Sequence, residues 1–344
     1  MSVKEEFIKT QIELEKRANK GKTFLGDSTI GDVDGEYGFN VNALELVDPK
    51  LYQPLYRFFW QIALPIRYGG GVKDLASFYK TNYSNADTQG NASGAMNVFS
   101  TTKIQLEKIS TRVVAFAQAV EVGQFEGWRA DAVGLDLVNA YQEGAAKKYN
   151  KFLDQTVFFG FPNVADSYGL ANCPDCKDED VAAKWETQTA TAIFEELNTL
   201  IMNLLKECDF DERANPDRLL VPFSFFTKLS LPMAIVGTNN ATATTGISLF
   251  NYLKANLAKN IAGYDGTIDI IGCPYLETAG KASTGRIIAY KYSEEVARGI
   301  ICMELTRGAT VLDTNSFGTK TSFAAFIGEP QIIYPSAIRY LDNI

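Results

Sequence analysis

The feature that most constrains the fold is a long helical repeat of apolar residues near the middle of the chain. Over residues 125–157, large or apolar side chains recur at intervals of four and three residues, which is the period of a helix with one buried face. They are Val133, Leu137, Tyr141, Ala145, Tyr149 and Phe152. About 30 residues at a rise of about 1.5 Å each predict a spine-like helix of about 45 Å. Gly127, Gly134 and Gly144 weaken it, and we interpret them as points of close approach by another backbone.

The stretch that follows this repeat, residues 156–174, reads TVFFGFPNVADSYGLANCP. Gly160 and Pro162 are residue types that end helices, and Gly169 predicts a backbone angle that other residues resist. Three aromatic side chains are expected to pack the junction: Phe158, Phe159 and Phe161. The stretch has no obvious catalytic group, so we interpret it as the connection between the helix and the next domain.

Before the helix, two extended segments flank a stretch of small polar residues. Residues 72–83 have strand character, and residues 101–120 alternate apolar and polar side chains at the strand period. Between them, residues 83–97 read YSNADTQGNASGAMN and look flexible. The pattern predicts a long two-stranded hairpin with a polar tip and little core of its own.

The elements after the turn are shorter and mixed. Helices are expected at 190–207, 224–230 and 248–258. Strands are expected at 219–221, 267–271, 286–292 and 299–305. The segment 321–344 predicts strands broken at Gly328 and Pro335, while residues 1–20 predict an amphipathic helix that leads into an extended arm at 21–40. There is no regular βαβ order, so the predicted fold class is α+β.

Composition excludes several classes of protein. The chain of 344 residues contains no histidine and carries a net charge of −8. The missing histidine excludes the Ser-His-Asp triad, the Cys-His pair and histidine-based zinc sites. The negative charge argues against DNA binding through a basic face and against an anionic membrane, although an acidic shell can still surround DNA. The apolar run at 58–66 is too short for a membrane span, and the N-terminus lacks a signal-peptide core, so we expect a soluble protein made in a cytoplasm.

Two short motifs resemble binding sites without completing one. GKT at 21–23 lacks the first glycine of a phosphate loop, because Lys16 stands at that position. CPDC at 173–176 has the spacing of half a four-thiolate zinc site. Two of the three other cysteines would have to complete it: Cys208, Cys273 and Cys302. The alternative is a tight turn with two ordinary thiols, and no metal site is predicted.

Charged side chains leave two further alternatives. We expect Asp178, Glu179 and Asp180 to be the acidic first residues of a helix, and Glu195 and Glu196 to form a solvated helix face rather than a catalytic pair. A Lys-to-Asn isopeptide cross-link needs no histidine, and four lysines flank the hairpin: Lys73, Lys80, Lys103 and Lys108. Whether they cross-link or stay solvated is left open, and no catalytic or cofactor-binding residue is predicted.

The order of these parts resembles the phage major capsid protein of the Hong Kong ninety-seven type, whose fold is shared with encapsulin shells. In this family the long helix commonly ends in a glycine turn and a run like GL-N-P, which here is Gly160 and then Gly169, Leu170, Asn172 and Pro174. The C-terminal IGEPQIIYPSAIRYLDNI is similar to the closing strand of a capsid subfamily. The matching residues there are Pro335, Ser336, Tyr340, Leu341, Asp342 and Ile344.

This resemblance implies a domain plan for the whole chain. Residues 1–71 would be an N-terminal arm, and 72–112 would be the E-loop hairpin that reaches over a neighbouring subunit. Residues 113–177 and 311–344 would form the peripheral domain with the spine helix, and 178–310 the axial domain. Candidate contacts between subunits lie at the hairpin tip: Gln89, Gly90, Asn91, Ala92, Ser93 and Gly94.

The resemblance also implies a function. The chain would be a structural protein and not an enzyme, assembling through pentamers and hexamers into the icosahedral shell of a tailed phage. Packaged double-stranded DNA would be enclosed without sequence-specific binding, with no membrane and no cofactor involved. Expected partners are other copies of the chain and scaffold, protease, portal and decoration proteins, and the expected location is the virion after synthesis in a host cytoplasm. The alternatives are an encapsulin-like compartment that stores a protein cargo and a histidine-free enzyme in the mixed domain.

Overall fold

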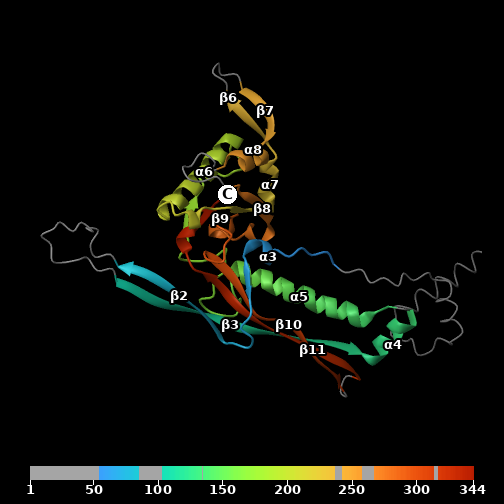
Figure 1. Ribbon diagram of the computed structural model, residues 1–344. Coiled ribbons are helices and arrows are strands. Elements are labelled where there is room, and N and C mark those ends of the chain that lie inside the picture. Colours follow the sequence, from blue (N-terminus) through green and yellow to red (C-terminus); the bar gives the residue numbers. More distant parts are fainter. Residues whose placement is uncertain (1–53, 85–102, 134, 237–241, 258–266, 314–316) are drawn as a thin grey trace, which may run out of the picture. The chain divides into compact units, whose positions relative to one another are not determined.

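The computed structural model describes residues 54–84, 103–133, 135–236, 242–257, 267–313 and 317–344 (Figure 1). Most of these residues, within Gln53–Trp128 and Leu137–Ile344, form one compact unit, and the contacts reported below belong to it. The predicted N-terminal helix and arm at 1–40 lie outside the described residues.

The first sheet contains five strands in the order β1-β10-β11-β3-β2 and is antiparallel except for the β1–β10 pair. Its strands are β1 (Ile66–Tyr68), β2 (Leu75–Ser84), β3 (Lys103–Gly123), β10 (Ala297–Asp313) and β11 (Gly318–Ile332). The long strand β3 serves two partners in turn, because residues 103–112 pair with β2 and residues 113–123 pair with β11. The predicted hairpin is therefore confirmed as an extension of a sheet that also contains β10 and β11 from the C-terminal part of the chain and the short strand β1.

The second sheet has the order β4-β12-β9-β5-β8 and mixes parallel and antiparallel pairs. Its strands are β4 (Lys177–Asp180), β12 (Ile338–Asp342), β9 (Ile287–Tyr290), β5 (Arg218–Pro222) and β8 (Asp269–Cys273). All four residues of the central strand β9 are buried, which is the pattern of a strand covered on both faces. A separate two-stranded ribbon joins β6 (Pro232–Val236) to β7 (Thr242–Ser248).

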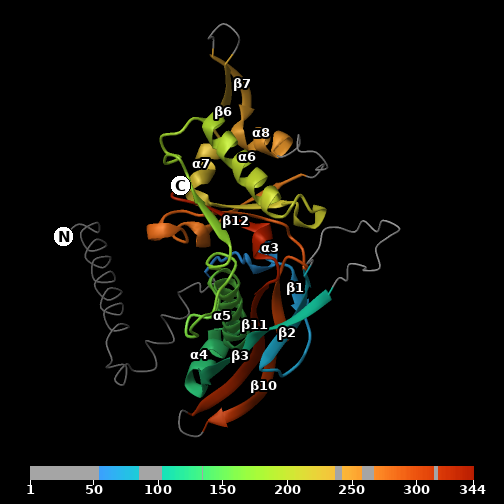
Figure 2. The same ribbon diagram turned by 90° about the vertical axis from the view of Figure 1, so that its left-hand side faces the viewer.

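Helices pack against both sheets. Helix α5 (Leu137–Phe159) packs Tyr149 and Phe152 on Phe116 of β3, with ring centroids 5.5 and 5.2 Å apart. Figure 2 shows a second group of helices beside the second sheet. They are α6 (Ala190–Glu207), α7 (Phe223–Leu229) and α8 (Leu249–Asn256). The remaining helices are α3 (Trp60–Ala63), α4 (Gln124–Val133) and the 3₁₀ turns η2 (Glu212–Ala214), η3 (Pro274–Leu276), η4 (Lys281–Ser283) and η5 (Pro335–Ala337).

The prediction that the long apolar repeat forms a single helix is wrong. Helix α4 ends at Val133 and α5 begins at Leu137, and the first buried residue of α5 is Ala145. Only the C-terminal half of the repeat therefore has a packing surface to hold it straight. A Cβ atom at Gly127 or at Gly144 would meet nothing within 4 Å, so these glycines do not mark a close approach.

Two further local predictions are wrong, and two are confirmed. Strand β11 continues through Gly328, where a side chain would meet the Cβ of Ile300 at 2.9 Å, so this glycine provides space for a neighbouring strand and does not end β11. The acidic run 178–180 lies in strand β4 and not at a helix start. The break at Pro335 and the helix 190–207 are confirmed.

Candidate functional site

The junction at the end of α5 begins with a glycine in the left-handed region. Gly160 has a φ of +79°, and its N–H donates to the carbonyl of Thr156 at 2.8 Å. The prediction that Gly160 ends the helix is therefore confirmed. Gly169 has a different role from the one predicted, because a Cβ there would lie only 2.4 Å from the carbonyl carbon of Phe158. Its glycine is required by space and not by a backbone angle.

The GLAN run, residues 169–172, caps the last carbonyls of α5. A helix leaves its final carbonyl groups without intrahelical donors, and buried carbonyls need other partners. The partners of the Val157, Phe158 and Phe159 carbonyls are the N–H of Leu170 (2.9 Å), the N–H of Ala171 (2.8 Å) and the Nδ2 of Asn172 (3.0 Å). The Oδ1 of Asn172 in turn accepts the N–H of Gly169 at 2.6 Å. The GLAN run thus folds back on the long helix α5 and caps its C-terminal end.

The three aromatic residues of the turn pack the junction as predicted. Phe158 is fully buried and stacks on Tyr275, with ring centroids 5.0 Å apart. Phe161 is buried and stacks on Phe152 at 6.1 Å, while Phe159 meets the same Tyr275 edge-on at 6.4 Å. Because Tyr275 follows β8, these contacts join the end of α5 to the second sheet.

A buried carboxylate ties α5 to the segment before the first sheet. The Oδ1 of Asp154 accepts the N–H of Phe59 at 2.8 Å and the N–H of Trp60 at 2.7 Å, which are donors at the start of α3. Its Oδ2 accepts the hydroxyl of Tyr56 at 2.9 Å. Burial raises the pKa of Asp154, and the hydrogen bonds that the carboxylate accepts oppose this rise.

Residues of the C-terminal YLD run, 340–342, also stabilise the cap that the GLAN run forms. Arg286 and Asp342 form a buried bidentate ion pair, with Nε–Oδ1 and Nη2–Oδ2 distances of 2.7 Å. The guanidinium of Arg286 also donates to the carbonyl of Ala171 and lies 4.3 Å from the centroid of the Tyr340 ring. The Tyr340 hydroxyl donates to the carbonyl of Leu170 at 2.7 Å. The two stretches that carry the family resemblance therefore contact one another.

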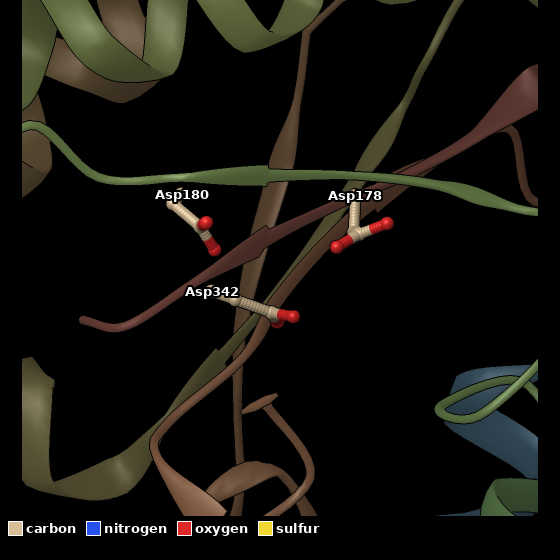
Figure 3. Close-up of side chains that lie close together, drawn as sticks. All are labelled: Asp178, Asp180 and Asp342. Carbon is tan, nitrogen blue, oxygen red and sulfur yellow. The ribbon is translucent and has the colours of Figure 1, made fainter. Parts of the chain in front are cut away.

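Three carboxylates gather beside this ion pair. Asp178 and Asp180 on β4 lie close to Asp342 on β12, as Figure 3 shows. Lys281 pairs with both Asp178 and Asp180, and its hydrogen bond lowers the pKa of Asp178. Together with Arg286 on Asp342, protein cations already pair with all three carboxylates, so a divalent metal would have to displace these cations. The next acid of the run, Glu179, pairs with Arg339 of β12, and these cross-strand pairs explain why the acidic run is a strand.

The cysteines do not form the four-thiolate zinc site that was left open. All five are free thiols. Among the residues that the structure describes, the only cluster of three metal-ligating side chains is the aspartate group, and it includes no cysteine. Cys273 and Cys302 are both buried.

Large apolar side chains are exposed at several places in the described chain, and two groups of them lie on the hairpin and at α4. On the hairpin, Leu75 and Tyr79 of β2 and Ile104 and Leu106 of β3 point to one face, because their cross-strand register places them at alternating positions. We call these four residues the hairpin face. Their exposed fractions run from 59 to 70%, so the isolated subunit leaves this face in water.

A second exposed group, the aromatic corner, consists of Phe125 and Trp128 of α4 and Phe317 before β11. Phe125 lies 5.5 Å from Trp128 and 5.4 Å from Phe317 between ring centroids. All three side chains are more than half exposed. Contiguous exposed rings of this kind mark surfaces that meet another protein.

The six contact candidates predicted at the hairpin tip lie outside the described residues: Gln89, Gly90, Asn91, Ala92, Ser93 and Gly94. They stay a prediction. The hairpin face was missed by sequence reasoning, although the alternation at residues 104 and 106 carried the signal. The aromatic corner was missed because its members meet only through the pairing of β3 with β11. Within the described part of the chain, no helix is both long and apolar enough to cross a membrane.

A mixed α+β subunit with a capped long helix, a projecting hairpin and large exposed apolar faces defines the class of shell-forming capsid subunits. A family profile described as major capsid protein matches residues 86–344, and the chain belongs to that family. No curated protein sequence matches the chain.

Solved structures show the same fold. The capsid of Myoviridae phage XM1 matches with a TM-score of 0.72 and 15% identity, over 88% of this chain and 98% of that one. A chain from Mycobacterium phage Bobi matches with a TM-score of 0.58 and 13% identity, over 88% and 96%. A virus-like particle from Pyrococcus furiosus matches with a TM-score of 0.50 and 14% identity, over 83% and 92%. The fold is that of the Hong Kong ninety-seven type, as the sequence indicated.

Proposed function

We propose that this major capsid protein assembles through pentamers and hexamers into the icosahedral shell of a tailed phage, around double-stranded DNA. The observation that carries the proposal is the family match over residues 86–344, which covers α5, the second sheet and the strands β3, β10 and β11 of the first sheet. The chain acts by association and not by turnover. Its location in this proposal is the virion, after synthesis in a host cytoplasm.

The exposed faces support assembly as the function. The hairpin face leaves four large apolar side chains in water, and β2 is an edge strand of its sheet. An uncovered strand edge with apolar side chains is a liability for a soluble subunit. Contact with a second copy, repeated by symmetry, would cover the same surface on every subunit. Many modest contacts of this kind add up through multivalency.

The predicted domain plan enters the proposal with two additions. The arm at 1–71, the E-loop at 72–112, the peripheral domain at 113–177 and 311–344, and the axial domain at 178–310 keep their roles. Strand β10 passes the limit at 310 while remaining in the first sheet, so in this plan it links the axial and peripheral domains. The arm likewise contributes β1, which pairs with β10.

The partners follow from the same plan. Other copies of the chain are the principal partners, and scaffold, protease, portal and decoration proteins are the accessory ones. The net charge of −8 favours a shell that surrounds DNA over one that binds it tightly. The second candidate is a compartment for protein cargo, favoured by the similarity to the Pyrococcus furiosus virus-like particle.

Electron microscopy of the purified protein, alone and with its scaffold, tests the proposal. We expect closed icosahedral shells, with nuclease-resistant DNA inside particles isolated from infected cells. Particles filled with one protein species instead of DNA would favour the cargo compartment. A monodisperse monomer under all assembly conditions would contradict both.

A further inference from the structure

The CPDC stretch, residues 173–176, forms a turn that brings its two cysteines close together. Cys173 and Cys176 are the first and last residues of one tight turn, in which the N–H of Cys176 donates to the carbonyl of Cys173 at 3.4 Å. Such a turn brings its end Cα atoms within about 7 Å. Disulfides span Cα separations of about 4.4–6.8 Å, so the turn allows the two sulfurs to bond without moving the backbone far.

The two thiols are chemically unequal. The sulfur of Cys173 accepts hydrogen bonds from the Cys176 thiol and from the backbone N–H groups of Asp175 and Cys176, and the bond from the thiol is the main reason that its pKa falls to about 7. The same bond, together with burial, raises the pKa of Cys176. Cys173 is therefore the stronger nucleophile at neutral pH, and Cys176 is held ready beside it.

Both thiols line one cavity of about 320 Å³. Its wall also includes Tyr340, Asp178 and the cations Lys281 and Arg286, both of which are paired with carboxylates. Cys208, Cys273 and Cys302 do not line it. The pair thus borders a cavity through which a small reagent can reach it, although Cys173 and Cys176 are only 9% and 5% exposed.

We propose that Cys173 and Cys176 form a redox-active dithiol, which a low-molecular-weight disulfide oxidises to an intramolecular disulfide. The Cys173 thiolate attacks one sulfur of the reagent, a mixed disulfide forms, and the first thiolate leaves and takes up a proton. Cys176 then loses its proton and attacks the Cys173 sulfur, which releases the second thiolate. Two protein thiols are oxidised in total, and one reagent disulfide is reduced to two thiols.

The consequence for the shell rests on the proposed function. A capsid protein made in a reducing cytoplasm leaves the cell for oxidising surroundings, where disulfides persist. The bond would then close in the turn that joins the cap of α5 to strand β4, beside the buried Arg286–Asp342 pair. The disulfide is thus a covalent cross-link that is absent during assembly and present in the released particle.

The test uses the full-length protein, reduced and then exposed to oxidised glutathione at neutral pH. Trypsin releases residues 152–177 as one peptide, because Lys151 and Lys177 flank it, and this peptide contains both cysteines of the pair and no other. We expect it to lose the mass of two hydrogen atoms before Cys208 reacts, although Cys208 is the more exposed thiol. Cys176→Ser should stop the reaction at a glutathione adduct on Cys173, and Cys302→Ser should leave it unchanged.

The outcomes separate the two proposals. Slower oxidation of the pair than of Cys208, or adducts on wild-type protein without ring closure, would overturn the redox proposal even if shells form normally. Disulfide formation in a protein that never assembles would keep the dithiol and contradict the capsid function. With both present, we expect oxidised shells to dissociate more slowly in denaturant than reduced shells. The Cys173→Ser/Cys176→Ser shells should show no such difference.

Discussion

At the scale of single residues, polar contacts hold the end of α5 in place as much as apolar packing does. The carbonyls of Leu170 and Ala171 receive donors from Tyr340 and Arg286, residues more than one hundred positions away in sequence. Arg286 is fixed by Asp342, whose side chain is fully buried. A buried ion pair of this kind is costly to break from one side, because the remaining charge has no water to solvate it.

The first prediction concerns this pair. Asp342→Leu leaves Arg286 buried without its partner, and we expect the free energy of unfolding of the unassembled subunit to fall by about 3–5 kcal/mol. The double variant Arg286→Met/Asp342→Leu should recover part of that loss, since it removes both charges. Urea denaturation measures each value. Arg213→Ala, which breaks an exposed pair with Asp211, is the control and should leave the stability unchanged. Equal losses in the single and double variants would contradict the argument.

The second prediction is the pH dependence that comes from Asp154. Burial raises its folded pKa above the unfolded value of about 3.9, so the folded protein binds the proton more tightly. Its contribution to stability is full below about pH 4 and is lost as the pH rises through the folded pKa. Asp154→Asn keeps the acceptor oxygen for the Phe59 and Trp60 N–H groups but does not titrate. We expect the variant to gain stability relative to wild type with rising pH, and parallel denaturation curves would contradict this.

At the scale of elements, two glycines should respond in opposite ways to the addition of a side chain. Gly169 touches the backbone of Phe158, and an added methyl group there has no space. Gly144 lies on the exposed side of α5 with nothing near it. We therefore expect Gly169→Ala to destabilise the subunit by about 1–3 kcal/mol and Gly144→Ala to stabilise it by up to about 1 kcal/mol. Thermal or urea unfolding measures both, and a neutral Gly169→Ala would show that the cap tolerates displacement.

The same elements show how far the sequence predicts the fold. Helix 190–207 was found to the residue, because its apolar face repeats without interruption and Thr189 accepts the N–H of Ala192 at its start. The break between α4 and α5 was missed, since periodicity reports an apolar stripe but not where a partner surface ends. The acidic strand β4 was missed because its stability comes from Lys281 and Arg339, which are distant in sequence. Local patterns thus predicted the elements, and contacts between residues distant in sequence decided the exceptions.

The candidate site was likewise predicted only in part from local sequence patterns. The turn at 156–174 was recognised from its glycines and aromatic residues, and its partner stretch at the C-terminus was recognised separately. Their contact through Arg286 could not be predicted, because nothing near Arg286 in the sequence marks it as the residue that joins them. The aromatic corner was equally hidden, since β11 places Phe317 beside α4 only after the sheet has formed.

At the scale of the whole molecule, stability and assembly use different surfaces. One apolar core is lined by both sheets and α5, and the other by the second sheet and the helices α6, α7 and α8, whereas the hairpin face and the aromatic corner contribute little to the isolated subunit. Substitutions on these exposed surfaces should therefore separate folding from shell formation. Substitutions in the cores should affect both.

The last prediction tests this separation at the aromatic corner. Phe125→Gln/Trp128→Gln removes two exposed rings of α4 and keeps residues that favour a helix. Phe317 is left in place, because its φ of +46° makes substitution there a backbone change as well. We expect the unfolding free energy to stay within about 0.5 kcal/mol of wild type, since both rings are mostly in water already. Shell yield, counted by light scattering and electron microscopy, should fall at least about tenfold, because each ring buried between subunits contributes about 1.5–3 kcal/mol. Phe210→Asn is the control and should assemble as wild type does, because it removes a half-exposed ring elsewhere and Asn tolerates the φ of +59° at that position. Normal shells from the α4 variant would show that the aromatic corner faces solvent in the particle.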